Sequence, residues 1–119
     1  MGIVHHATYL VYFEAGRVEW LRRRGITYTE WTSRGLHLPV ATAEVQYKSP
    51  SRFDDELTVT TTLAKMRTVS LEFTYRITGG ESVIVEGATR LACVDSTMKL
   101  LRLPADIQAA LLRGETNAT

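Results

Sequence analysis

The stretch ATYLVYFEAGRVEWLRRR, residues 7–24, decides the fold of this chain. Its apolar side chains recur at the spacing of an α-helix, and its charged side chains fall between them. Three consecutive arginines close the stretch, where they favour the negative end of the helix dipole, and Gly25 follows as a candidate C-cap. Gly16 lowers the helix propensity, and we expect another part of the backbone to pass close to it. The pattern therefore predicts one long helix pressed against a sheet.

After a polar stretch from Thr27 to Gly35, the hydrophobic period changes to two, the spacing of half-buried β-strands. The adjacent glycines Gly79 and Gly80 indicate a tight turn between the last two strands. A proline suited to a first helical turn, followed by apolar residues at helical spacing, predicts a short closing helix from Pro104 to Arg113. The predicted strands are His37–Tyr47, Glu56–Lys65, Ser70–Thr78 and Ser82–Val94.

The long helix is the one predicted element able to cover the apolar face of these strands. On the third strand that face carries Leu71, Phe73, Tyr75 and Ile77. Short connections favour antiparallel pairing, so we predict a single α+β domain, residues 1–119, in which an antiparallel sheet wraps around one central helix. Such a domain leaves sheet edges and apolar surface open, which favours pairing with a second copy of the chain.

Composition narrows the possible functions. The chain has 119 residues and a net charge of +1, which fits one domain and gives no cationic surface for nucleic acid or acidic membranes. No apolar run reaches the roughly 20 residues of a membrane span, and the beginning of the chain lacks a signal-peptide profile, so we expect a cytoplasmic protein. The single cysteine, Cys93, lies in a predicted strand and is expected to be a buried, unreactive thiol.

Chemistry is expected at the beginning of the chain. The segment GIVHHATY, residues 2–9, forms a loop that leads directly into the long helix. The first amides of a helix have no intrahelical acceptor, so this junction can direct N–H groups at a developing negative charge. His5 and His6 are adjacent rather than one helical turn apart, and no cysteine lies near them, so we predict no metal site.

Several short motifs follow one another in a set order: GIVHHATY (2–9), FE (13–14) with Arg17, YKSP (47–50) with Asp54 and Asp55, MRTVSLEF (66–73), CVD (93–95) and LP (103–104). In this order and spacing the chain resembles the acyl-CoA thioesterases of the hot-dog fold. The resemblance is greatest to the hydroxybenzoyl-CoA thioesterase group and its bacterial Tol-Pal-associated relatives. It implies an acyl-CoA substrate, no cofactor, and a homodimer or homotetramer whose active sites are built between subunits.

The same resemblance assigns roles at the start of the helix. The backbone amide of His6 takes the position of the family's oxyanion-binding amide, which polarises the thioester carbonyl. Gly2, Val4, His5 and Tyr9 would lie along the substrate. His5 also fits a structural role, and His6 also fits a helix-start residue without chemistry. The family's catalytic aspartate belongs three residues before the position of Gly2, upstream of the first residue, so we expect a truncated start rather than a natural loss of this group.

Glu14 is the best candidate for a catalytic carboxylate within the sequence. It lies slightly more than two helical turns after His6, and other hot-dog thioesterases carry their base on this helix, so Glu14 is a candidate general base or water-positioning group. It fits equally well a buried structural acid paired with Arg17 or with a backbone amide. Asp54 and Asp55 fit turn residues better than catalytic ones.

A cationic, hydroxyl-bearing segment lies where the second predicted strand meets the third. Related enzymes place basic residues of this region against the CoA phosphates, which suits cations and hydroxyls. The candidate CoA-binding residues are Lys65, Arg67, Thr68 and Ser70. Arg90 and Arg102 are weaker candidates, and a solvated surface explains the same charges equally well. We expect hydrolysis of an acyl-CoA thioester to a free acid and CoA. The alternatives are a non-catalytic module that binds acyl-CoA or acyl-carrier protein and, less favoured, a hot-dog dehydratase.

Overall fold

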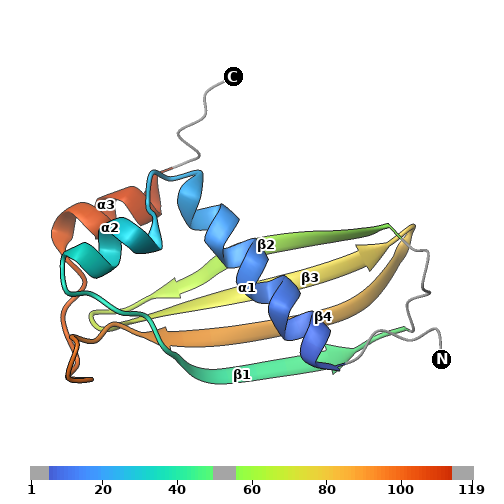
Figure 1. Cartoon of the computed structure of the whole chain (residues 1–119). Helices are drawn as coiled ribbons and strands as arrows, with labels where there is room; N and C mark the ends of the chain where they lie inside the picture. Colours follow the sequence, from blue (N-terminus) through green and yellow to red (C-terminus); the bar gives the residue numbers. More distant parts are fainter. Residues whose placement is uncertain (1–5, 50–55, 114–119) are drawn as a thin grey trace.

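A computed structural model describes residues 6–49 and 56–113 of the chain, without the side chains of residues 6 and 7. The described elements are α1 (His6–Arg22), α2 (Tyr28–Ser33), β1 (Val40–Tyr47), β2 (Leu57–Met66), β3 (Ser70–Gly79), β4 (Ser82–Ala92) and α3 (Ala105–Leu112) (Figure 1). The strands form one antiparallel sheet in the order β1-β4-β3-β2, so β1 and β2 are its edges within the described chain. This arrangement confirms the predicted α+β fold class.

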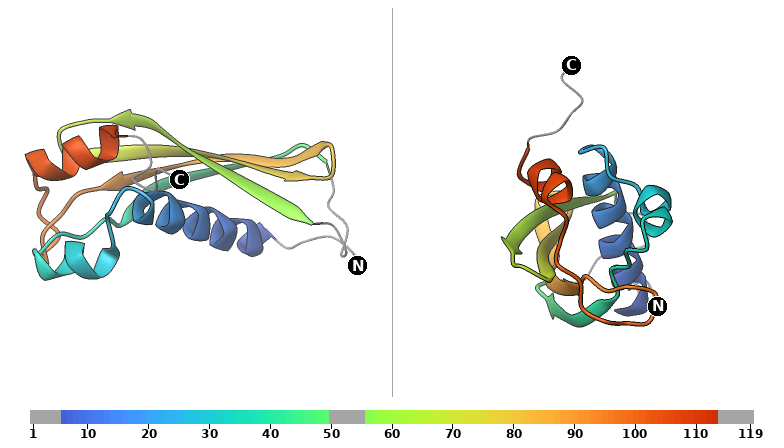
Figure 2. Two further views of the ribbon diagram at one scale, coloured as in Figure 1. Left: turned by 90° about the horizontal axis from the view of Figure 1, so that it is seen from above. Right: turned by 90° about the vertical axis from the view of Figure 1, so that its left-hand side faces the viewer.

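The core lies between α1 and the face of the sheet that the helix crosses, as the two views of Figure 2 show. The alternating residues predicted to form the core face of β3 are all buried: Leu71, Phe73, Tyr75 and Ile77. Phe13 of α1 stacks on Tyr75 with ring centroids 4.5 Å apart. Apolar burial of about 25 cal/mol per Å² holds the helix on the sheet. Cys93 is also buried, and burial raises the pKa of its thiol, which confirms the expected unreactive cysteine.

α1 is the predicted long helix, with bounds that differ by one or two residues from the predicted range 7–24. It begins at His6 and ends at Arg22. Gly25 ends the helix as predicted, because its φ of +78° is a left-handed conformation that glycine adopts without strain. In the same turn, the Ile26 N–H donates to the Leu21 carbonyl at 3.0 Å.

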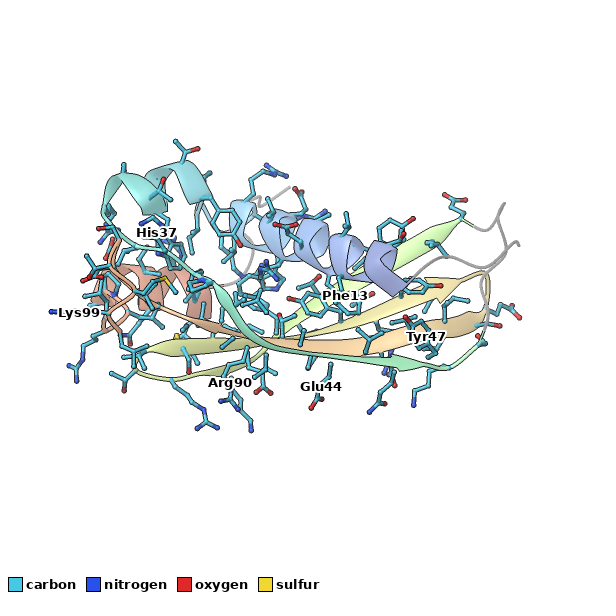
Figure 3. The ribbon with its side chains drawn as sticks, turned by 60° about the horizontal axis from the view of Figure 1, so that its bottom comes forward. Phe13, His37, Glu44, Tyr47, Arg90 and Lys99 are labelled. Carbon is cyan, nitrogen blue, oxygen red and sulfur yellow. The ribbon has the colours of Figure 1, made fainter. Side chains whose placement is uncertain are left out.

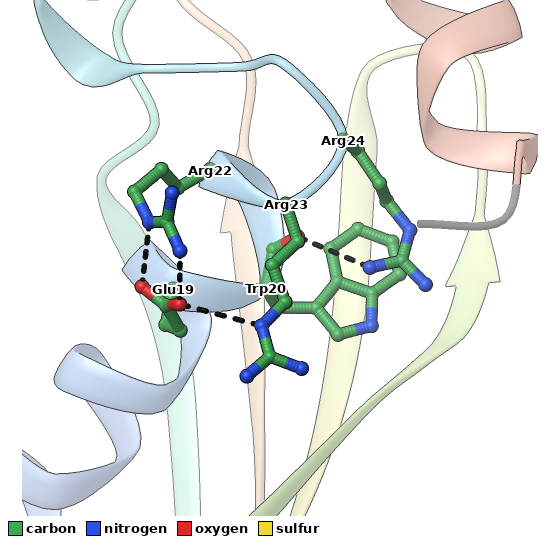
Figure 4. A network of polar contacts seen from close by, with 5 residues as sticks. All are labelled: Glu19, Trp20, Arg22, Arg23 and Arg24. Carbon is green, nitrogen blue, oxygen red and sulfur yellow. Dashed lines mark hydrogen bonds and ion pairs between the residues drawn. The ribbon is translucent and has the colours of Figure 1, made fainter. Parts of the chain in front are cut away.

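The arginines that close α1 interact with the last turns of the helix. Glu19 accepts hydrogen bonds from Arg22 Nε at 2.8 Å and from Arg23 Nε at 3.3 Å (Figure 4). The hydrogen bonds from Arg22 are the largest cause that lowers the pKa of Glu19 to about 2. The Arg24 guanidinium lies 3.5 Å from the centroid of the Trp20 ring, a cation–π contact. The ion pairs are exposed, so they contribute little to folding stability.

At Gly16, α1 packs closely against β2. A Cβ atom on Gly16 would lie 2.5 Å from Thr61 Oγ1 and 3.0 Å from Val59 Cγ1. Both distances are shorter than an ordinary van der Waals contact of a carbon atom. The predicted close approach at this glycine is therefore confirmed.

The polar stretch from Thr27 to Gly35, for which we predicted no regular element, contains the short helix α2. Thr27 is its N-cap, and the threonine side chain accepts a hydrogen bond from the Glu30 backbone N–H at 3.2 Å. The pattern Thr-x-x-Glu is that of a capping box, so the sequence did carry a signal for this helix. α2 buries Trp31 in the core.

The strands and the closing helix occur where they were predicted, with shifted ends. The largest shift is at β1, which begins at Val40 rather than His37. Pro39 has no N–H for the ladder, and His37 pairs with Val94 through an isolated bridge outside the named strands. α3 begins directly after Pro104. Within the described residues, no helix is long and apolar enough to cross a bilayer.

α1 packs mainly over β2 and β3 and leaves the inner face of β1 open. On β1, Val40 and Tyr47 are 48% and 52% exposed, and on α1, Leu10, Val11 and Val18 are 36%, 59% and 40% exposed. We call these five residues the open apolar surface. Exposed apolar side chains next to a free sheet edge are typical of an interaction site.

Candidate active site

The start of α1 lies at one end of the sheet, beside the end of β1. The ring of Tyr9, in the first turns of α1, lies 5.7 Å from the ring of Tyr47 and 6.2 Å from that of Tyr12. Because α1 begins at His6, its first free backbone N–H groups lie near this aromatic corner, as a candidate oxyanion-binding site requires. The candidate site residues outside the described part of the chain are Gly2, Val4 and His5, together with the side chain of His6.

Two of the three tyrosines in the aromatic corner differ in exposure. Tyr9, a candidate substrate-binding residue, is buried, whereas Tyr47 is half exposed. Partial burial and the neighbouring Tyr9 raise the pKa of Tyr47, so its hydroxyl stays protonated at neutral pH. Tyr47 belongs to the quoted YKSP motif, but no sequence pattern places it beside the helix start.

Glu14 is exposed on α1. Within the single chain Glu14 is therefore not a buried acid, and among the described residues it does not pair with Arg17, because the Arg17 side chain points inward and bonds to tyrosines. At 100° per residue, Glu14 shares one side of α1 with Leu10 and Val18, away from the flank that faces β2. The carboxylate of Glu14 thus lies within the open apolar surface, about 12 Å along the helix from its start.

Arg17 is a buried cation with neutral partners. Its Nε donates to Tyr28 OH at 3.1 Å and its Nη1 to Tyr75 OH at 3.2 Å, and Tyr75 OH lies 2.6 Å from Thr89 Oγ1. Burial alone would lower the pKa of Arg17, but the hydrogen bonds to the two tyrosines outweigh burial and raise it. The network joins α1 to α2, β3 and β4, and it fixes the helix that carries the candidate site.

The candidate CoA-binding segment lies at the other end of the sheet. It comprises residues at or beside the β2–β3 hairpin, namely Lys65, Arg67, Thr68 and Ser70. Next to this hairpin, Leu71 pairs with Leu91, which pairs with Val40 at the start of β1. Since β1 has eight residues, about 23 Å at roughly 3.3 Å per residue separates this end from Tyr47. One protomer does not bring the candidate CoA-binding residues to its own helix start.

Backbone hydrogen bonds join the segment after β4 to the β2–β3 hairpin, which gathers further cations at this end. Arg67, Lys99 and Arg102 are exposed there, and none of them makes an ion pair within the described residues. Figure 3 shows Lys99 at the extreme end of the molecule, while Arg90 projects with Glu44 from the outer face of the sheet. Of the two weaker candidates, Arg102 therefore lies with Arg67 and Lys99 at this end of the molecule, which we call the cationic end. Arg90 lies on the outer face of the sheet instead.

Comparison with known proteins shows to which family the chain belongs. Residues 1–111 match the family model of the thioesterase-like superfamily. The chain belongs to this superfamily. It is 34% identical over 110 residues to the acyl-CoA thioester hydrolase YbgC of Escherichia coli, a match that covers 91% of this chain and 82% of that protein.

Solved structures show the same fold. A hypothetical protein of Thermus thermophilus, TT1821, superposes with a TM-score of 0.86 and 38% identity, over 93% of this chain and 85% of that one. The DHNA-CoA thioesterase of Staphylococcus aureus superposes with a TM-score of 0.87 and 26% identity, over 92% of this chain and 77% of that one. The resemblance to hot-dog thioesterases, inferred from the order of short motifs, is confirmed for the fold and the enzyme family.

Proposed function

We propose that the protein hydrolyses an acyl-CoA thioester to a free acid and CoA at the start of α1. The observation that carries this proposal is the helix start itself, placed beside Tyr47 at the rim of the open apolar surface in a member of the thioesterase-like superfamily. The names of two relatives, an acyl-CoA thioester hydrolase and a DHNA-CoA thioesterase, support CoA thioesters as the substrate class.

The proposed reaction uses one backbone amide and one carboxylate. The His6 N–H donates to the thioester carbonyl oxygen and stabilises the oxyanion that forms there. Glu14 takes a proton from a water molecule as the water oxygen attacks the carbonyl carbon. The tetrahedral intermediate then collapses, the C–S bond breaks, and the CoA thiolate takes up the proton that Glu14 holds. One water is consumed, and the acid and CoA are released.

The proposed active unit is a dimer in which a second copy covers the open apolar surface. Among the described residues β1 is a free sheet edge, and both its inner face and one side of α1 expose apolar side chains. Edge pairing with a second copy would satisfy the free backbone groups of β1 and bury these side chains together. Glu14 would then lie in a water-poor interface, where a carboxylate acts more strongly on a bound substrate. A homotetramer made from two such dimers would keep this pairing.

A continuous sheet with a two-fold axis requires the two β1 strands to run antiparallel. The Val40 end of each β1 then lies beside the Tyr47 end of the other. The cationic end of one protomer is thereby brought toward the α1 start of its partner. The 23 Å separation within one protomer, about the length of β1, is consistent with a site that is completed across the interface.

A thiol-release assay on Glu14→Gln tests the mechanism. We expect the rate to fall about 100-fold to 10,000-fold, because the variant keeps the shape of the side chain but lacks the base. Glu19→Gln is the matched control on the same helix, since Glu19 binds Arg22 and Arg23 away from the site. If the two variants are equally fast, Glu14 is not the base. Wild-type protein that binds acyl-CoA without releasing thiol would instead be a non-catalytic binding module.

A further inference from the structure

A cavity of about 240 Å³ lies between α2 and α3. Figure 1 shows both helices at the end of the molecule away from the start of α1. The apolar residues that line the cavity are Ile26, Trp31, Ile107 and Ala110. Neither the candidate oxyanion site nor the cationic end contributes a lining residue, so the cavity is separate from both.

The two helices that enclose the cavity are joined by an ion pair. Arg34, the C-cap residue of α2, donates from Nη1 to Asp106 Oδ2 at 2.9 Å and from Nη2 to Asp106 Oδ1 at 3.0 Å. Two parallel hydrogen bonds between an arginine and a carboxylate fix the orientation of the groups as well as their distance. At the start of α3, Gln108 Nε2 donates to the Leu103 carbonyl at 2.7 Å. The walls of the cavity are therefore connected directly to each other.

Trp31 brings an unpaired hydrogen-bond donor to this cavity. The side chain is 1% exposed, and its Nε1 has no hydrogen-bond partner among the described residues. An indole N–H only donates, and burial without an acceptor costs the free energy of its lost contact with water. Nearly all buried polar groups in proteins are paired, so this N–H requires an acceptor that the described residues do not supply.

The size of the cavity limits what can supply that acceptor. Drug-sized ligands occupy pockets of about 300–1,000 Å³, whereas an apolar cavity of about 150 Å³ binds one benzene molecule. The volume of about 240 Å³ lies between these values. It fits a single ring that carries a short polar substituent.

The charges around the cavity favour a neutral ligand. Arg34 and Asp106 neutralise each other in their ion pair. Glu30 and Arg113 also line the cavity and add one charge of each sign. All four side chains belong to exposed residues, so the charges lie at the mouth of the cavity and sum to zero. An ion entering the cavity would lose hydration without meeting a net opposite charge.

We propose that this cavity binds an uncharged single-ring compound whose oxygen accepts a hydrogen bond from the Trp31 indole N–H. The ring packs between Trp31 and the apolar side chains of α3, Ile107 and Ala110. The site is independent of the hydrolysis proposed at α1, because none of its lining residues takes part in that reaction.

Nuclear magnetic resonance of the indole N–H groups tests the proposal. The chain has two tryptophans, so Trp20→Phe identifies the signal of Trp31. The main probe is acetophenone, a single ring with a carbonyl oxygen. We expect acetophenone to shift the Trp31 signal until the site is saturated. The Trp20 signal should stay in place, because Trp20 does not line the cavity.

Trp31→Phe separates the hydrogen bond from the apolar contacts. The variant keeps an aromatic ring but lacks the donor. Ethylbenzene is the matched probe, because it has the ring and carbon chain of acetophenone without the oxygen. In binding measured through the ligand signals, we expect Trp31→Phe to weaken acetophenone about tenfold relative to ethylbenzene. Benzoate, which carries a charge on the same ring, should bind wild-type protein more weakly than acetophenone.

Ala110→Leu tests the position of the site. The larger side chain fills the space between the helices, so acetophenone binding should weaken at least tenfold. Ala109→Leu is the matched control, because Ala109 is exposed on the same helix and does not line the cavity. It should leave the affinity unchanged. The Trp20 indole signal and the thermal unfolding midpoint show whether each variant is folded, and Trp31→Phe decides the proposal without either of them.

Four results would overturn the proposal. The first is a Trp31 signal that acetophenone does not shift, which would leave water as the partner of the indole N–H. The second is an equal loss of acetophenone and ethylbenzene in Trp31→Phe, and the third is equal acetophenone affinity in Ala110→Leu and Ala109→Leu. The fourth is benzoate that binds at least as tightly as acetophenone, which would assign the cavity to carboxylates. None of these measurements depends on thiol release, so the proposed hydrolysis stands or fails separately.

Discussion

Gly16 lets α1 approach β2 more closely than any residue with a Cβ would allow. Replacing it with alanine favours the helix by about 1 kcal/mol but forces the new methyl group against Thr61 and Val59, and overpacking of this kind costs about 1–3 kcal/mol. We expect Gly16→Ala to lower the free energy of unfolding measured by chemical denaturation. In a Thr61→Ala background the main clash is absent, so Gly16→Ala should be neutral or stabilising. Equal effects in both backgrounds would contradict the close approach.

Single residues differ in how far the sequence predicts them. The close approach at Gly16 and the burial of Cys93 were predicted, because each depends on the sequence pattern immediately around it. The partners of Arg17 were not, since Tyr28 and Tyr75 lie 11 and 58 residues away and meet Arg17 only after folding. The predicted partner, Glu14, lies within one helical turn of Arg17. Its side chain is exposed, however, whereas the Arg17 side chain is buried.

At the scale of elements, Asp95 organises the loop that follows β4. Hydrogen bonds from the Thr97 hydroxyl and the Lys99 N–H hold the pKa of Asp95 below its usual value of about 3.8. A depressed carboxyl pKa stabilises the folded state above the unfolded pKa, and this stabilisation is lost as the pH falls through the folded pKa. We expect the stability difference between wild type and Asp95→Ala to be constant above about pH 5 and to shrink below about pH 4.

Asp95→Asn is the control for this titration, because the amide oxygen still accepts hydrogen bonds but does not ionise. Its stability difference from Asp95→Ala should not vary with pH. If the stability difference between wild type and Asp95→Ala stays constant down to pH 2, the Asp95 charge does not stabilise the loop.

How well a helix or strand could be predicted depends on how regular its pattern of apolar residues is. α1 and β3 were found with ends within two residues because their apolar residues keep one period over many positions. α2 has six residues, too short for a period, and the capping box from Thr27 to Glu30 was its main signal. The start of β1 was placed three residues early, because the alternating pattern continues through Pro39 although the ladder does not.

At the scale of the whole molecule, the candidate site was only partly predictable. The motifs identified the helix start and the cationic hairpin, but a linear sequence does not show that these lie at opposite ends of the sheet. Antiparallel pairing of two copies is the physical step that connects the separated parts.

Mixing two inactive variants tests that step directly. In Glu14→Gln the proposed base is lost from α1, and in Arg67→Glu a candidate CoA-binding cation is replaced by an acid, so each homodimer should hydrolyse a subsaturating acyl-CoA slowly. In a mixed dimer whose sites combine α1 of one protomer with the cationic end of the other, one site has both defects and the second has none. Dissociation and reassociation at equal amounts should therefore restore about one quarter of the wild-type rate, measured by thiol release. Sites contained within one protomer would give no recovery, because every mixed dimer would then carry one defect in each site.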